Sequence, residues 1–111
     1  MPGPIQPKWG TPRQHSRFVI DLRVVVRAED QIYGRTRDLS EGGVGAVLTG
    51  DLKVNQVVEV EFQLPGRNEP LYMTAEVRYR RGFQYGLKFL NPGEQQLEAI
   101  RRATRNLPVV R

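Results

Sequence analysis

The chain has 111 residues, enough for one compact domain, and its 39% hydrophobic and 26% charged residues are typical of a folded globular protein. It has no cysteine and a single histidine, His15, which excludes a disulfide framework, a thiolate zinc site and a multi-histidine metal centre. The 17 basic and 12 acidic side chains give a net charge of +5, and no apolar run is long enough to insert into a membrane. We expect a small, basic, cytoplasmic domain.

The N-terminal residues predict a flexible tail over 1–12. This segment contains four prolines and two glycines without apolar periodicity, so we expect it to be extended or disordered. Trp9 lies within it and is expected to pack on the domain, with stacking on a flat ligand as the alternative. Residues 1–17 carry three basic side chains and no acid. This charge suggests either an anionic partner met by a mobile arm or a tail that keeps the domain soluble.

From Phe18 onward, apolar and polar residues alternate with the period of half-buried strands. Turn residues such as Pro65 to Asn68 separate the alternating segments. The pattern predicts six strands, over 18–27, 31–37, 44–48, 57–64, 71–80 and 83–89. Short strands at this spacing are typical of a small antiparallel β-barrel.

The period changes to that of a helix after the last strand. Asn91 is predicted to be the N-cap, with Pro92 in the first helical position and Glu94 as an acid at N3. Apolar residues then recur at helical spacing as far as Leu107, and Pro108 is expected to end the helix. The fold class is therefore mainly β, a six-stranded antiparallel barrel with one C-terminal α-helix.

Catalysis is not expected. The two serines, Ser16 and Ser40, lack the glycine pattern of a nucleophile elbow, and no carboxylates are spaced as a hydrolase pair. The glycines at 42–45 are not followed by the lysine of a phosphate-binding loop. We interpret the protein as a binder that is not an enzyme and needs no cofactor or metal.

Two short motifs carry the binding hypothesis. The first is an Arg-x-x-x-Arg at Arg13 to Arg17, the arginine arm, which alone says little in a chain so rich in arginine. The second is an Asp-x-Ser-x-x-Gly from Asp38 to Gly43, a much rarer pattern. The local alternative is a turn in which Asp38 and Ser40 bond the nearby backbone and Gly43 supplies a positive φ.

In this order, the two motifs resemble those of the PilZ domain. The segment Tyr85-Gly86-Leu87-Lys88-Phe89 is similar to the closing-strand signature of that family. The resemblance covers 13–107 and leaves 108–111 as a short C-terminal tail. The family fold, a six-stranded antiparallel barrel with a C-terminal helix, agrees with the strand count.

The resemblance implies a receptor for the bacterial second messenger cyclic di-GMP. Arginine binds phosphates and guanine edges bidentately, and a carboxylate can accept from the N1–H and N2–H₂ groups of guanine. Because the arginines lie on an arm, the ligand is expected to order that arm and to present a changed surface to an unidentified downstream protein. The implied ligand contacts are Arg13, Arg17, Asp38, Ser40 and Gly43, with Gln14 and Gly42 as secondary candidates.

Two other functions stay open at this point. One is a PilZ-like protein-interaction module that does not bind the nucleotide. The other is a binder of single-stranded nucleic acid, favoured by the basic ends but disfavoured because such proteins display several outward aromatic rings. Here Tyr72 is expected to face outward, whereas the core is expected to hold Phe62, Tyr79, Phe83, Tyr85 and Phe89. Nucleic acid is therefore not the expected partner.

Overall fold

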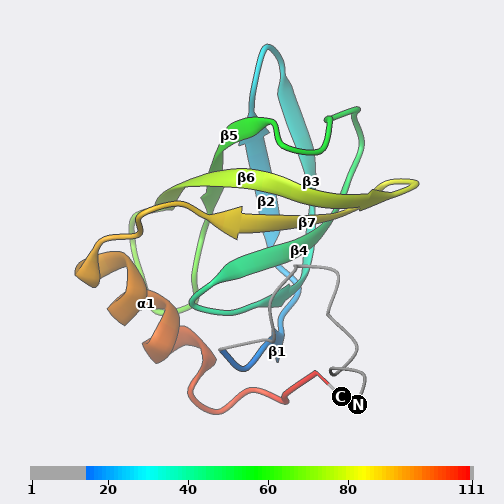
Figure 1. Cartoon of the computed structure of the whole chain (residues 1–111). Coiled ribbons are helices and arrows are strands. Elements are labelled where there is room, and N and C mark those ends of the chain that lie inside the picture. The colour runs from blue at the N-terminus through cyan, green and yellow to red at the C-terminus, as the bar shows by residue number, and fades with distance from the viewer. Residues whose placement is uncertain (1–14, 111) are drawn as a thin grey trace, which may run out of the picture.

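The structure is a computed structural model that describes residues 15–110 (Figure 1). Its elements are β1 (Phe18–Val19), β2 (Arg23–Arg27), β3 (Gln31–Leu39), β4 (Gly43–Leu48), β5 (Val57–Phe62), β6 (Leu71–Arg81), β7 (Gln84–Phe89) and α1 (Glu94–Thr104). Antiparallel pairing runs β3-β2-β5-β6-β7-β4, and β4 pairs with β3 to close a six-stranded barrel with β1 outside it. The predicted fold class is confirmed.

The first predicted strand, 18–27, is interrupted, so its prediction as one continuous strand is wrong. Both β1 and β2 pair with β3, but residues 20–22 between them leave the regular ladder. The hydroxyl of Thr36 fills the gap: it accepts the Leu22 N–H at 2.8 Å and donates to the Ile20 carbonyl at 2.7 Å. Buried backbone groups need such partners, so the side chain replaces part of the missing ladder.

The barrel interior holds the alternating apolar residues that the sequence indicates. On β5 and β6, the predicted period of two is confirmed, with every second residue buried from Val58 to Phe62 and from Leu71 to Val77. Tyr85 is fully buried, and its hydroxyl accepts the Leu52 N–H and donates to the Gly50 carbonyl. The largest side chains of the core are Tyr85, Phe62, Leu39, Leu48, Leu52, Leu64, Met73, Leu87 and Ile100.

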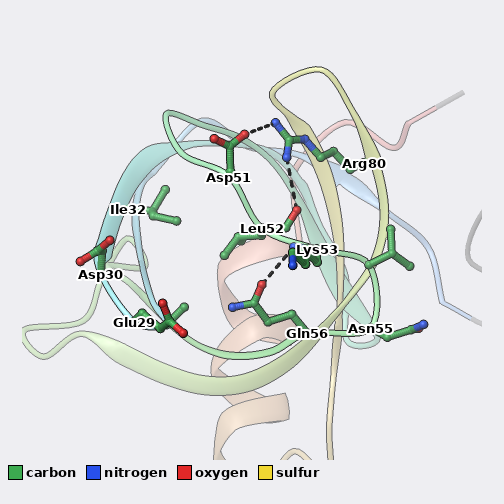
Figure 2. A pocket seen from close by; sticks show the side chains of 11 residues that line it. Glu29, Asp30, Ile32, Asp51, Leu52, Lys53, Asn55, Gln56 and Arg80 are labelled. Atoms are coloured by element: carbon green, nitrogen blue, oxygen red, sulfur yellow. Dashed lines mark hydrogen bonds and ion pairs between the residues drawn. The ribbon is translucent and has the colours of Figure 1, made fainter.

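Helix α1 covers one end of the barrel. Figure 2 looks into the barrel from the opposite end, so the helix lies behind the ring of strands. Its start differs from the prediction. Asn91 has a φ of 47°, whereas an N-cap residue takes the extended conformation found at Gly93, with φ −77° and ψ 160°. The Gln96 side chain accepts the Gly93 N–H at 2.6 Å, so Gly93 is the N-cap and Glu94 begins the helix.

The helix also ends earlier than predicted. Its last residue is Thr104, and Leu107 packs on the core from the following turn, where its N–H donates to the Thr104 carbonyl. Pro108 to Val110 then lie along β1: the Val19 N–H donates to the Pro108 carbonyl and the Val110 N–H to the Arg17 carbonyl, both at 2.8 Å. Within residues 15–110, no helix combines the length and apolar character needed to cross a membrane.

Candidate ligand-binding site

A bulge in β3 sets the direction of Asp38. The pairing of β3 with β4 shifts by one residue between Thr36 and Asp38. Upstream of the bulge, Thr36 belongs to the buried face; downstream, Leu39 is in the core and Asp38 turns to the outer face of the barrel. A bulge inserts one extra residue and so exchanges the two faces of the strand beyond it. Asp38 therefore lies within β3, which continues two residues beyond its predicted end at 37.

Arg17 joins the arginine arm to this carboxylate. Its Nε donates to Oδ1 of Asp38 at 3.1 Å and its Nη2 to Oδ2 at 2.8 Å, a bidentate pair. Both side chains are largely covered, with 13% of Arg17 and 11% of Asp38 exposed. The Arg17 backbone is held by the Val110 N–H, so the C-terminal segment contributes to the position of this guanidinium. The two motifs, separated by 21 residues in the sequence, thus meet at one point.

Ser40 shapes the loop between β3 and β4. Its Oγ accepts the N–H groups of Gly42 and Gly43, each at 3.1 Å, and the Ser40 N–H donates to the Gly43 carbonyl at 2.9 Å. Ser40 is therefore a turn cap, as the local alternative expected. The same alternative is wrong for Asp38, which bonds Arg17, and for Gly43, since the described glycines with positive φ are Gly66 and Gly82.

Four paired residues form a row across the outer face of the barrel, and Asp38, the partner of Arg17, is at one end of this row. Asp38 pairs with Gly45, Gly45 with Gly86, and Gly86 with Tyr79, across β3, β4, β7 and β6. A second register shift, between Val77 and Tyr79, turns Tyr79 out of the buried phase. The prediction of Tyr79 as a core residue is therefore wrong.

Phe83 also differs from its prediction: it lies in the turn before β7 and is 58% exposed. Tyr72, the expected outward ring, is 52% exposed, and Phe62 and Phe89 are buried as expected, with ring centroids 6.4 Å apart. Sequence reasoning missed that Gly45 lies against the Asp38 carboxylate and that Tyr79 lies on the outer face beside Gly86. The only indication in the sequence was a glycine at position 45 inside a predicted strand, where a residue with a side chain is usual.

A smaller pocket of about 310 Å³ separates the start of β1 from α1, lined by His15, Ser16, Phe18, Glu41, Arg101, Thr104 and Arg105. Arg101 bridges the β3–β4 loop and the helix: its Nε donates to Glu41 at 3.1 Å and its Nη1 to Glu94 at 2.9 Å. Hydrogen bonds to these two carboxylates raise the pKa of the Arg101 guanidinium above its usual value, and the bond to Glu94 has a larger effect than the bond to Glu41. Arg101 therefore keeps its charge and ties the motif loop to α1.

A larger cavity of about 670 Å³ opens at the barrel end away from α1 (Figure 2). It contains none of the predicted site residues. Arg80 lies at its edge, where it pairs with Asp51 and donates to the Leu52 carbonyl at 3.4 Å, and the Lys53 N–H donates to Gln56 at 3.0 Å. Because β3 runs from this end to the other, the cavity and the Asp38 site lie at opposite ends of the same strand.

The described residues include most of the predicted ligand contacts. Arg17, Asp38, Ser40, Gly42 and Gly43 gather around the end of β3. Arg13 and Gln14, like Trp9, lie outside the described residues. Within 15–110, no three His, Asp or Glu side chains gather in a way that could hold a metal ion.

Comparison with known proteins identifies the family. The sequence profile described as "PilZ domain" matches residues 11–106, which is most of the chain. The chain belongs to the PilZ domain family. A comparison of this PilZ domain with curated proteins gives no match.

Solved structures share the PilZ fold at low sequence identity. The Bacillus subtilis inhibitor of motility, MotI/DgrA, has a TM-score of 0.72 and 19% identity over 84% of this chain, which spans only 49% of that protein. The PilZ domain of YcgR from Escherichia coli, determined with c-di-GMP, has a TM-score of 0.71 and 18% identity, covering 86% of this chain and 90% of that one. The PilZ domain of CeSA from a cellulose-synthesizing bacterium gives 0.65 and 21%, covering 80% and 94%.

Proposed function

We propose that this PilZ domain is a cytoplasmic, non-enzymatic receptor for cyclic di-GMP. The observation that carries the proposal is the bidentate pair of Arg17 and Asp38, which brings the two sequence motifs into one largely covered site. Family membership supports the same ligand, as does the likeness to the YcgR domain determined with c-di-GMP.

The chemistry of the site suits a guanine nucleotide with two phosphodiesters. A guanidinium can bind a phosphate or the O6/N7 edge of guanine with two parallel hydrogen bonds, and it can stack on the base. The Asp38 carboxylate accepts hydrogen bonds, so it can bind the donor edge of guanine. Asp38 holds the Arg17 fork in one orientation and so reduces the side-chain entropy lost on binding.

The loop after β3 contributes through its backbone. Ser40 fixes the amides of Gly42 and Gly43, and neither glycine has a Cβ that would keep a ligand from approaching the backbone. We assign Ser40 and Gly43 to the site in this positioning role, with Gly42 beside them. Arg13 completes the pair of arginines on the arm, and Gln14 is its neighbour.

The proposed output is a change in the arginine arm. A ligand that bridges Arg13 and Arg17 to the end of β3 would hold the arm against the barrel and alter the surface there. A partner protein would then recognise the altered surface. Limited proteolysis and amide exchange test this step: saturating ligand should protect the segment around Arg13, and an arm cut at the same rate with and without ligand would contradict it.

The first experiment is a calorimetric titration with cyclic di-GMP. Wild type should bind at micromolar concentration or below, and Arg17→Ala and Asp38→Ala should each lose measurable binding. Arg23→Ala is the matched control, because Arg23 is an exposed arginine on β2 outside the site. No binding by wild type would refute the receptor function and leave the protein-interaction module as the better interpretation.

A further inference from the structure

A second row of paired residues crosses the outer wall of the barrel, distinct from the row that contains Asp38. Arg23 on β2 is directly opposite Arg35 on β3, and Arg35 is directly opposite Val47 on β4. Val47 pairs in turn with Gln84 on β7, and Gln84 pairs with Arg81 on β6. All five residues are exposed. This row therefore contains three arginines and no carboxylate.

The fold does little to neutralise the charge of this row. Like charges directly opposite one another lower the stability of a sheet, and Arg23 and Arg35 are such a pair. Arg35 donates to Asp21 at 2.7 Å, but 73% of the Asp21 side chain is exposed, and exposed ion pairs contribute little. Among residues 15–110, no carboxylate forms an ion pair with Arg23, Arg81 or the neighbouring exposed Arg37. This wall therefore attracts an acidic partner.

Exposed apolar side chains lie between these charges. Tyr33 is 56% exposed, two residues from Arg35 on β3, and Val47 is 38% exposed on the other side of Arg35. The Tyr33 hydroxyl donates to Gln31 at 2.7 Å, which helps to fix the ring. Tyrosine and arginine are the residue types that dominate the energetics of protein–protein interfaces. The arginine face is defined here as Arg23, Tyr33, Arg35, Arg37, Val47 and Arg81.

The closed barrel limits how a partner can bind this face. Strands β2, β3 and β4 each have a paired strand on both sides, so none of them offers a free edge to an added strand. A partner must therefore contact the face through side chains. Outward residues repeat about every 6.7 Å along a strand, and side chains on one face of an α-helix repeat about every 6 Å. A helix thus matches the spacing of the outward residues.

We infer that the arginine face is the docking surface for an acidic amphipathic helix of a partner protein. The carboxylates of the helix pair with Arg23, Arg35 and the arginines beside them, and its apolar side chains pack on Tyr33 and Val47. This inference rests on the proposed function for the need of a partner protein, and it names the class of that partner. The face contains none of the proposed nucleotide contacts.

Other anionic partners match the face less well. Proteins that bind single-stranded nucleic acid present several stacking rings, whereas the arginine face has the single ring of Tyr33. Elements that bind a membrane surface gather their apolar side chains together and place the cations at the rim. Here Arg35 lies between Tyr33 and Val47, so a cation occupies the centre of the apolar area. The pattern favours a protein helix with mixed acidic and apolar side chains.

The test is a fluorescence anisotropy titration of a labelled helical peptide with leucines along one side and glutamates one turn apart beside them. Wild type should bind this peptide, and the double variant Arg23→Glu, Arg35→Glu should bind it at least about tenfold more weakly. A matched peptide with lysine in place of each glutamate should instead prefer the double variant. The control is Arg67→Glu with Arg102→Glu, which makes the same change of net charge at exposed arginines outside the face. Thermal unfolding checks that each variant is folded.

The apolar part of the face is tested by Tyr33→Ser. This variant should bind the acidic peptide about fivefold more weakly. Tyr72→Ser, at an exposed tyrosine of β6 outside the face, should bind it like wild type. Absence of peptide binding by wild type would overturn the inference. An equal loss in the Arg67→Glu, Arg102→Glu control would also overturn it, because binding would then depend on net charge alone.

Two further probes test the class of partner. Phosphatidylglycerol vesicles or an oligothymidylate that bound wild type more tightly than the peptide, through the same two arginines, would show that the partner is not a helix. Cyclic di-GMP should bind the Arg23→Glu, Arg35→Glu variant with unaltered affinity. Nucleotide binding without peptide binding by wild type would refute the docking surface alone. Peptide binding without nucleotide binding would refute the receptor function and leave the docking surface intact.

Discussion

The carboxylate of Asp38 lies over the α-carbon of Gly45, where an added Cβ would stand 2.9 Å from Oδ1 and 3.0 Å from Oδ2. Gly45 has no positive φ to explain it. Its role is to leave space: the missing side chain lets Asp38 lie along the barrel surface and present both oxygens to Arg17. The position of the candidate site thus depends on a residue that neither motif contains.

Gly45→Ala should therefore weaken the site while preserving the fold. The new methyl group must displace the Asp38 carboxylate, which should lower the free energy of unfolding by about 1–2 kcal/mol and the affinity for cyclic di-GMP at least about tenfold. Gly93→Ala is the control, since a Cβ there has 3.5 Å to its nearest neighbour and Gly93, the N-cap of α1, is not part of the row. Unaltered binding by Gly45→Ala would mean that the orientation of Asp38 does not matter.

Arg17→Lys tests the geometry of the pair at constant charge. An ammonium group cannot make two parallel hydrogen bonds to one carboxylate, so we expect affinity to fall more than about tenfold and stability by about 1 kcal/mol. Arg23→Lys should change neither, because Arg23 is exposed. Calorimetry and urea unfolding give both numbers. If Arg17→Lys retained wild-type affinity, charge alone would account for the role of Arg17.

Ser40→Ala should destabilise the loop that joins β3 to β4. The buried hydroxyl accepts two backbone N–H groups, and removing it leaves both without this partner, which should cost about 2 kcal/mol of stability. Ser16→Ala is the matched control, since Ser16 is exposed and is the chain's other serine. Equal unfolding midpoints for the two variants would show that the cap is dispensable.

Gly86→Ala should be among the more damaging single-methyl additions in the barrel. The methyl group would overlap the Tyr79 ring, and we expect a loss of about 2–3 kcal/mol. In a Tyr79→Ser background the overlap is gone, so the same substitution should cost at least about 1 kcal/mol less. Urea unfolding of the four proteins in this double-mutant cycle measures the difference. An identical cost in both backgrounds would show that the ring is not the obstacle.

Much of the fold follows from the sequence alone. The period of two on β5 and β6 and the change of period after β7 depend on local chemistry, because each residue contributes its own polarity whatever its distant partners are. The rare Asp38-to-Gly43 pattern and the arginine arm likewise identified most of the candidate site. The ends of the helix were harder to predict from the sequence. Asn91 has a side chain typical of an N-cap but takes a left-handed φ, so Gly93 caps the helix instead.

Only the tertiary structure decided which face Asp38 and Tyr79 occupy. A bulge adds one residue on one strand relative to its partner, so it is defined by the pairing of the two strands and not by either strand alone. Strict alternation consequently put Tyr79 in the core. The contacts of Gly45 with Asp38 and of Gly86 with Tyr79 were also not predictable from the sequence. A glycine in a strand indicates that space is needed there, but it does not indicate which side chain occupies that space. The sequence by itself determined which side chains are available to the site. The register of four paired strands determined the positions of those side chains on the barrel surface.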